Sequence, residues 1–223
     1  MQSENCPNCG AEVIFRSPAL PARICDYCHS TVKRIADGVE LAGEVAVLPF
    51  DVSPIQIGTR GEIGDKSFEV IGRIRLGYGQ GAWNDWLCLF SDNSHGWLSE
   101  SDGQFQLVVE RSIADTDSEL IQRLAKGGQA QVGERTSIDG ASFVITDVRK
   151  ATCIAAEGEL PFAPSTGWTV FNVDLRDPQG FSANFELEEE GANFYVGRYV
   201  TLAELKTKNL RAIHGWKMPD YAA

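Results

Sequence analysis

The sequence predicts a mainly β protein in which two repeated small antiparallel β-barrel-like units, joined by a helix, follow an N-terminal cysteine-rich module. Three observations predict this fold class: two cysteine pairs near the N-terminus, short alternating apolar runs broken by turn residues, and a pattern that recurs 75 residues later. The expected domains are residues 1–36 (cysteine module), 50–110 (first β unit), 111–128 (linker helix) and 129–223 (second β unit).

Four of the six cysteines form two Cys-X-X-Cys pairs, Cys6 with Cys9 and Cys25 with Cys28. Each pair aims two sulfur atoms at one point, so the two pairs supply four thiolates to a tetrahedral ion. This spacing predicts a zinc ribbon with structural Zn²⁺, because four thiolates leave no position for an activated water. Rubredoxin-like iron remains an alternative. A disulfide pair is disfavoured in a chain that shows no export signal.

The remaining cysteines, Cys88 and Cys153, lie in apolar runs, and we expect buried free thiols there. Between the module and the first β unit, residues 39–50 carry an expected strand. Further short apolar runs bounded by Gly, Asp and Asn predict an antiparallel meander.

The repeat begins at Ile57 and returns at Val132 with a constant offset. Five identities carry it: Gly58 with Gly133, Arg60 with Arg135, Ile63 with Ile138, Ser67 with Ser142, and Phe68 with Phe143. Two five-stranded units of this length suit small closed or half-open barrels, and one larger sandwich is the alternative.

A helix is expected between the copies, in DTDSELIQRLAKGG. Acidic residues and a serine stand at its start, three apolar residues share one side, and two glycines end it. A second short helix is expected in residues 201–206, followed by an edge strand in residues 210–216.

The formal net charge is −11, and the acidic residues lie mostly beyond the cysteine module. An acidic surface disfavours nucleic acid and anionic membranes, because both are bound chiefly through Lys and Arg. It favours a protein partner or a polycationic small molecule. No apolar stretch is long enough to span a bilayer, so we expect a cytoplasmic protein with no direct membrane span.

The segment GAWNDWLCLF, Gly81 to Phe90, is the densest aromatic and acidic cluster. Strand alternation places Trp86, Cys88 and Phe90 on one face, which favours a core role for them. An aromatic surface beside a carboxylate also suits an ammonium group. The candidate ligand-binding residues are Tyr78, Trp83, Asn84, Asp85 and Trp86.

The second copy offers a comparison for this cluster. Gly167 and Trp168 align there with Asp85 and Trp86, which favours a shared core role for the tryptophan and a role in one copy only for Asp85. No second carboxylate, nucleophile or open metal can be placed beside Asp85 from the sequence, so we name no catalytic residue.

The cysteine pairs, the WNDW motif and the GWLSE stretch together resemble a bacterial family known as a domain of unknown function. In that family a CPNCG and CPYCG ribbon precedes one or two β units with a WNEW-like motif. Here Asp26 and His29 depart from the second knuckle of the family, and Asp85 replaces its glutamate. The resemblance implies genomic neighbours that resemble phage-shock-protein-A-like membrane-stress proteins and spermidine-synthase-like enzymes.

These observations favour a noncatalytic zinc-binding interaction or adaptor protein, active in bacterial envelope stress. The first alternative is a sensor that binds a polyamine or another cationic ligand through the aromatic and acidic cluster. The second alternative is a hydrolase or transferase that uses Asp85.

Overall fold

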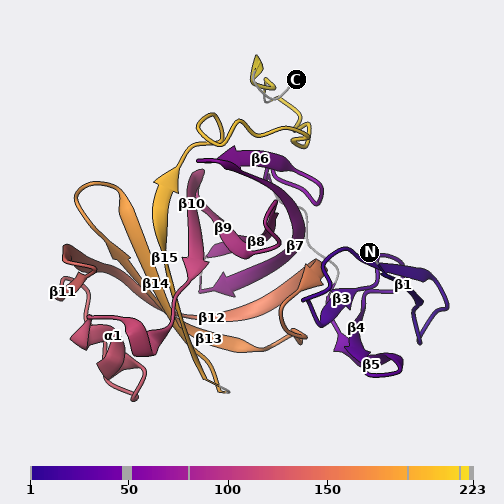
Figure 1. Ribbon diagram of the computed structural model, residues 1–223, viewed down its shortest axis with the longest axis horizontal. Coiled ribbons are helices and arrows are strands. Elements are labelled where there is room, and N and C mark those ends of the chain that lie inside the picture. The colour runs from indigo at the N-terminus through magenta and orange to yellow at the C-terminus, as the bar shows by residue number, and fades with distance from the viewer. Residues whose placement is uncertain (1, 47–51, 80, 190, 216, 221–223) are drawn as a thin grey trace.

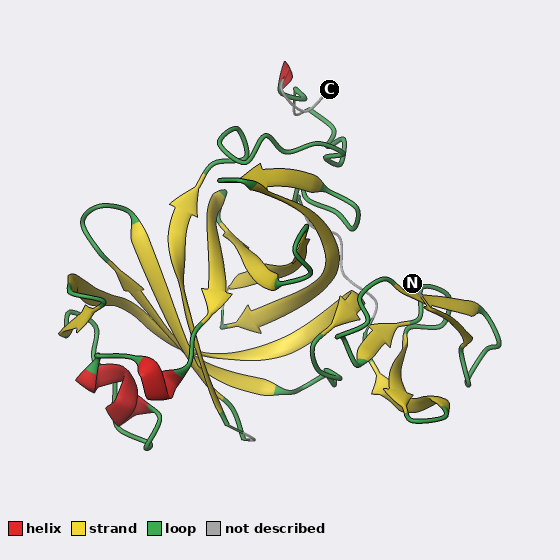
Figure 2. Cartoon of the chain, viewed as in Figure 1, coloured by secondary structure: helices red, strands yellow, loops and turns green. Residues whose placement is uncertain are grey.

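The computed structural model describes residues 2–46, 52–79, 81–189, 191–215 and 217–220. Strands make up most of these residues (Figure 2). The cysteine module lies at one end of the molecule and helix α1 at the other (Figure 1). Among the residues described, no helix is long and apolar enough to cross a membrane.

The cysteine module holds two short β structures. A hairpin forms a two-stranded sheet, and three further strands extend the main sheet of the protein. The hairpin strands are β1 (Gln2–Asn5) and β2 (Glu12–Phe15), and the others are β3 (Ala22–Ile24), β4 (Ser30–Ile35) and β5 (Gly38–Glu44). The strand expected in residues 39–50 is therefore β5, and residues 47–50 lie outside the described part of the chain.

Each β unit contains the five expected strands. The first unit comprises β6 (Arg60–Ile63), β7 (Lys66–Tyr78), β8 (Gly81–Phe90), β9 (His95–Ser101) and β10 (Gln104–Glu110). The second comprises β11 (Arg135–Ile138), β12 (Ala141–Leu160), β13 (Thr169–Arg176), β14 (Phe181–Leu187) and β15 (Ala192–Val200). All neighbouring strands pair antiparallel.

The two units share one curled sheet. Strand β10 pairs with β15 along Phe105 to Glu110, and β7 pairs with the second half of β12. With the pairs inside each unit, these contacts close a ring in the order β7, β8, β9, β10, β15, β14, β13, β12. The expectation of two β-barrel-like units is therefore corrected, because the ladders between the units leave neither unit closed by itself.

Each unit has its own apolar core on the side turned away from the other unit. In the first unit the core includes the fully buried Trp86 and is completed by Leu202, Leu205 and Leu210 from the C-terminal segment. In the second unit the core includes Phe185 and is covered by helix α1. These two cores leave the opposite faces of the strands turned toward each other.

The predicted linker helix is confirmed as α1 (Glu119–Leu124), preceded by the 3₁₀ helix η1 (Ile113–Asp115). The hydroxyl oxygen of Ser118 accepts a hydrogen bond from Ile121 N at 3.3 Å, which caps the helix. Leu120, Ile121 and Leu124 are buried in the second core. The apolar stripe seen in the sequence therefore covers the second unit.

The second expected helix is wrong. Residues 201–206 form a single turn in which Thr201 and Glu204 cap each other, with Thr201 N donating to Glu204 Oε2 at 2.7 Å. Lys206 then has φ of 46°, a left-handed conformation that ends the turn. Residues 210–215 form no strand, and Trp216, the last residue of the expected edge strand, lies outside the described residues.

The pairing registers correct the alignment of Trp86 with Trp168. Trp86 pairs with Leu98 and Leu98 with Leu107, whereas in the second unit Val173 pairs with Phe185 and Phe185 with Phe194. Each residue of the second set lies 87 positions after its counterpart. The offset exceeds 75 because β12 is longer than β7, with 20 residues against 13, and because the connection from β12 to β13 is also longer than that from β7 to β8. Val173, and not Trp168, is therefore the counterpart of Trp86.

Candidate ligand chamber and metal centre

The four predicted ligand cysteines come together at one point. Their sulfur atoms all lie within 4.8 Å of one another. Cys6 Sγ is 3.6 Å from Cys28 Sγ, and Cys9 Sγ is 3.7 Å from Cys25 Sγ. A tetrahedron with metal–sulfur bonds of ~2.3 Å has sulfur–sulfur edges of about 3.8 Å. The donor set therefore fits a four-coordinate metal ion.

Both knuckles have the backbone that such a centre needs. Gly10 and His29, which follow the pairs, have φ of 78° and 60°, and their amides donate to the carbonyls of Cys6 and Cys25. The pKa of Cys28 is lowered to about 6, chiefly because its sulfur lies within hydrogen-bond distance (3.4 Å) of the Ser30 hydroxyl. The lowered pKa favours the thiolate, the form in which cysteine binds metal. Cys88 and Cys153 are buried free thiols, as predicted.

The faces of the strands that turn away from the two cores line a chamber of about 430 Å³ that is partly open to solvent. Both units contribute to its walls. Its acidic lining residues are Asp85, Glu100, Asp102, Asp147, Asp174 and Glu186; its aromatic lining residues are Tyr78, Trp83, Trp97, Phe162, Trp168, Tyr195 and Tyr199. A chamber of this size accommodates a small organic molecule.

Asp85 projects from β8 into this chamber. Its Oδ2 accepts a hydrogen bond from Trp83 Nε1 at 2.8 Å, and its Oδ1 accepts one from Ser99 Oγ at 2.5 Å. Burial nevertheless raises the pKa of Asp85 from 3.8 to about 6, with a smaller contribution from the charge of Asp174. An Asp85 carboxylate in this place gains from a neighbouring positive charge.

Two carboxylates of the second unit face the same chamber. Asp174 Oδ1 accepts hydrogen bonds from Asn172 Nδ2 at 2.8 Å and from Asn184 Nδ2 at 2.6 Å. Burial raises the pKa of Asp174 and, much more, that of Glu186, which Asp85 and Asp174 also repel. None of the residues that the structure describes donates a hydrogen bond to the Glu186 carboxylate. The charge of Arg176 lowers the pKa of Asp174 in part, but none of the three acids forms an ion pair with a Lys or Arg of the described residues.

Two amide oxygens add to this group of acceptors. Asn184 is only 7% exposed, and its Oδ1 has no hydrogen-bond partner within the described part of the chain. The same holds for Gln106 Oε1, which is also buried. Both residues line the chamber. A buried acceptor without a donor is costly, so these atoms favour a ligand that brings N–H or O–H groups.

The two arginines of the chamber lining are already engaged by protein groups. Arg149 forms an ion pair with Asp147, and its guanidinium carbon lies 4.0 Å from the centre of the Tyr78 ring. Arg176 donates to Tyr199 Oη at 2.6 Å and to Gln104 Oε1 at 3.1 Å. Within the described residues, neither guanidinium group forms an ion pair or a hydrogen bond with Asp85, Asp174 or Glu186.

The structure divides the five predicted ligand residues between two faces. Tyr78, Trp83 and Asp85 line the chamber, and the rings of Tyr78 and Trp83 lie 5.7 Å apart at 42°. Trp86 is fully buried in the first core, and Asn84 is 5% exposed on that same side. A ligand in the chamber therefore does not reach Asn84 and Trp86 across their strand.

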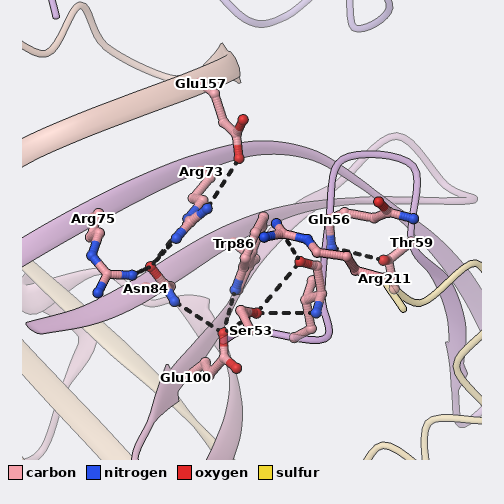
Figure 3. A network of polar contacts seen from close by, with 11 residues as sticks. Ser53, Gln56, Thr59, Arg73, Arg75, Asn84, Trp86, Glu100, Glu157 and Arg211 are labelled. Atoms are coloured by element: carbon pink, nitrogen blue, oxygen red, sulfur yellow. Dashed lines mark hydrogen bonds and ion pairs between the residues drawn. The ribbon is translucent and has the colours of Figure 1, made fainter. Parts of the chain in front are cut away.

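Asn84 and Trp86 belong to a separate buried polar network, shown in Figure 3. Asn84 Oδ1 accepts hydrogen bonds from Arg73 Nη2 at 2.7 Å and from Arg75 Nη1 at 3.2 Å. Glu100 Oε2 accepts from Asn84 Nδ2 and Trp86 Nε1, both at 3.1 Å. These contacts show that Asn84 and Trp86 stabilise the first unit, by core packing and by hydrogen bonds to its buried polar side chains.

The family relationship follows from a comparison with protein-family models. Residues 56–202 match the model of a family described as a domain of unknown function, DUF4178. This chain belongs to the DUF4178 family. The matched region begins just before β6, ends just after β15 and includes every strand that lines the chamber. No curated protein and no solved structure matches the chain.

The DUF4178 region supplies chamber residues that the sequence analysis missed, chiefly Asp174, Asn184 and Glu186. All three come from the second unit, about 90 to 100 positions after Asp85. Asn184 and Glu186 alternate along β14 between apolar residues of the second core, and this alternation was the available signal. The pairing of β10 with β15, which brings them to Asp85, has no local signature.

Proposed function

We propose that this DUF4178 protein binds a small organic cation, a polyamine or a related amine, in the chamber. One observation carries the proposal: three carboxylates with raised pKa values and the unpartnered Asn184 Oδ1 face one cavity. An ammonium group supplies both what the acids lack and what the amide oxygens lack, namely positive charge and N–H donors.

The aromatic residues suit the carbon chain of such an amine. Trp83 uses its N–H group on Asp85, so its ring face remains for contact with methylene groups or for a cation–π contact. Tyr78 lies beside it. A quaternary ammonium ion has no N–H groups and leaves the amide oxygens of Asn184 and Gln106 unsatisfied. The chamber therefore favours primary and secondary amines.

In this proposal the protein is noncatalytic and its metal centre is structural. Four cysteine ligands fill a tetrahedral shell around Zn²⁺, so the ion organises the module and activates no water. The cytoplasm is the proposed location, because cysteine thiols stay reduced there and so remain available to bind the ion. The polyamine then acts as a signal that the protein senses.

Calorimetric titration of the metal-loaded full-length protein with spermidine tests the proposal. We expect binding in the micromolar range that Asp85→Asn weakens at least tenfold at pH 7.5. Asp139→Asn is the matched control, because it makes the same change of charge at an exposed turn residue. Choline should bind more weakly than spermidine. Absence of heat with the wild-type protein, or equal weakening by both variants, would refute the proposal.

A second candidate function, the adaptor, is favoured by the surface of the cysteine module. Tyr27 stands between two ligand cysteines and is 78% exposed, and Ile14 on β2 and Leu41 on β5 are also exposed. Apolar side chains held by a metal knuckle suit a protein partner, including one in bacterial envelope stress. Photo-crosslinking from position 27 in cells tests this role, and no adduct above that from an exposed position on β11 would count against it.

The two units also suit an origin by duplication. Their first strands lie 75 positions apart, and their core triplets Trp86, Leu98, Leu107 and Val173, Phe185, Phe194 lie 87 apart. The longer β12 and the longer connection that follows it explain the difference. At the offset of 87, Asp85 corresponds to Asn172, Asp174 to Leu87 and Glu186 to Ser99, so each copy has acquired its own chamber acids.

A further inference from the structure

The cysteine module lies against one end of the chamber and is joined to it through buried contacts. Strand β3, which ends immediately before Cys25, pairs with the end of β12 through Arg23 with Glu159 and Ala22 with Leu160. β12 also provides chamber residues such as Thr146 and Arg149. Strand β12 thus runs from the chamber wall to β3, the strand that leads into the metal-binding Cys25.

Glu159 fixes the chain between the two knuckles. It is completely buried, its Oε1 accepts a hydrogen bond from Arg16 N at 2.7 Å, and its Oε2 accepts one from Ser17 N at 2.9 Å. Arg23 lies 3.6 Å away as its charge partner. A buried carboxylate with two backbone donors holds the module firmly in one position.

The aromatic end of the chamber is built together with the module. Ile24 and Val45 of the module belong to one apolar cluster with the chamber residues Trp83, Phe162 and Trp168. Val45 N donates to the carbonyl of His29, in the second knuckle, at 3.2 Å. The positions of Ile24 and Val45 therefore depend on the turn that contains Cys25 and Cys28.

The loop after β12 has a similar attachment. Phe162 and Trp168 lie at its two ends, with ring centres 5.2 Å apart, and both line the chamber. Ala46 N donates to Thr166 Oγ1 at 3.0 Å, and Thr31 Oγ1 donates to the Pro164 carbonyl at 3.4 Å. This loop is held in place by residues next to the second knuckle.

We propose that metal binding at the four cysteines controls the ligand chamber: the metal-loaded module holds its aromatic end in place, and metal loss releases it. The ligand part of this inference rests on the proposed function. Coupling between two sites is reciprocal, so the ligand must raise the affinity for metal by the same factor by which metal raises the affinity for ligand. The protein then responds to lower amine concentrations when its metal centre is filled.

The test compares the full-length protein loaded with Zn²⁺ and after removal of Zn²⁺ by a chelator. We expect spermidine affinity to fall between about 5-fold and 150-fold on removal, and spermidine to raise Zn²⁺ affinity equally. Acrylamide quenching of tryptophan fluorescence should increase, since Trp83, Trp97 and Trp168 line the chamber. Amide exchange in α1, at the far end of the molecule, should stay unchanged.

Two variants sharpen the test. Thr166→Ala removes one link between loop and module while leaving the cysteines intact, so it should reduce the coupling but not Zn²⁺ binding. Tyr27→Ala is the control, because Tyr27 is exposed and lies in the knuckle without binding metal; coupling should persist. If quenching rises on chelation but spermidine does not bind the loaded protein, the proposed ligand is wrong and the metal control of the chamber stands.

Equal quenching and equal spermidine affinity with and without Zn²⁺ would overturn the inference and leave the proposed function standing. Loss of protection in α1 together with the chamber would also overturn it, because metal would then stabilise the whole fold and not one end of the chamber.

Discussion

The guanidinium carbon of Arg73 lies 4.5 Å from the centre of the Trp86 ring, inside the first β unit. The Arg73 side chain is only 2% exposed, and burial lowers its pKa to about 10, so it stays charged at neutral pH. Asn84 accepts two of its hydrogen bonds, and Glu157, from β12, is its ion-pair partner at 3.4 Å. The ion pair between Arg73 and Glu157 ties the first unit to the second.

Arg73→Met should lower the free energy of unfolding by about 2 to 3 kcal/mol, somewhat below the full cost of breaking a buried pair, because Glu157 is partly exposed. Urea denaturation measures the change. Arg60→Met is the matched control: Arg60 also pairs with a glutamate but is 69% exposed, and its replacement should cost less than about 0.5 kcal/mol. Equal costs would contradict the role assigned to Arg73.

Trp83 and Trp86 should respond differently to replacement by phenylalanine. Trp86→Phe removes one of the buried donors to Glu100 Oε2, which keeps Ser53 and Asn84, and it loses volume in a filled core. Unfolding should therefore become easier by about 2 kcal/mol while spermidine affinity is retained. Trp83→Phe removes a donor to Asp85 in the chamber and should change spermidine affinity with little effect on stability. Denaturation and calorimetry on both variants provide the comparison, and reversed effects would refute the division between the two faces.

Ligand affinity should decrease as the pH falls through about 6. The pKa of Asp85 is raised to about 6 by burial, so below that pH the carboxyl is neutral and its attraction for an ammonium group is lost. Calorimetry between pH 5 and 8 should show this loss, and Asp85→Asn should flatten the profile. An unchanged wild-type profile would show that Asp85 does not contribute to binding.

The same raised pKa affects stability in the absence of ligand. The folded protein holds the Asp85 proton more tightly than the unfolded chain, so the stabilisation from this group is complete below the unfolded pKa of 3.8 and is lost as the pH rises to about 6. Asp85→Asn should remove this contribution from the pH dependence of the free energy of unfolding. The contribution is measured by denaturant titrations of both proteins across this range.

Gly158→Ala should destabilise the protein far more than Gly167→Ala. Both glycines have positive φ, 73° and 93°, so each alanine incurs backbone strain of about 1 to 2 kcal/mol. A Cβ at position 158 would also lie 2.2 Å from the Ile71 carbonyl oxygen, whereas position 167 is open. Because both alanines carry the backbone strain, the difference between their melting temperatures measures the cost of the clash where β7 and β12 lie close together. Similar melting temperatures would contradict the predicted clash at position 158.

Cys25→Ser should abolish stoichiometric metal binding, and Cys153→Ser should preserve it. Cys25 lies in the four-sulfur cluster, and Cys153 is a buried thiol of the body. Native mass spectrometry with elemental analysis measures the ion and its stoichiometry, for which we expect one Zn²⁺ per chain. A visible absorption band from iron would instead support the rubredoxin-like alternative.

The features that were predictable from the sequence are local ones. The spacing of Cys6, Cys9, Cys25 and Cys28 defines a four-sulfur cluster because the knuckle geometry is contained within a few residues. Alternation along β8 placed Trp86, Cys88 and Phe90 on one face, which is the core face in the structure, although Trp86 was also named as a candidate ligand residue. The cap at Ser118 and the apolar stripe defined α1 for the same reason.

The features that were missed depend on contacts between distant segments. Asp85 was predicted without a neighbouring carboxylate, since Asp174 and Glu186 reach it only through the pairing of the two units. The turn at Thr201 shows the opposite case: a good local helix signal was overridden because Lys206 adopts a left-handed backbone conformation where the chain returns to β6.

The closure of the sheet has a consequence for synthesis on the ribosome. A chain emerges from its N-terminus, and β10 finds its partner β15 only after Val200 has left the exit tunnel. Until then β10 has an unpaired edge, which is prone to association with other chains, whereas β7 is already paired once residues 152–158 of β12 have emerged. The nascent chain therefore exposes the edge of β10 until Val200 has emerged, whereas the four cysteines of the knuckles emerge long before and can already take up metal.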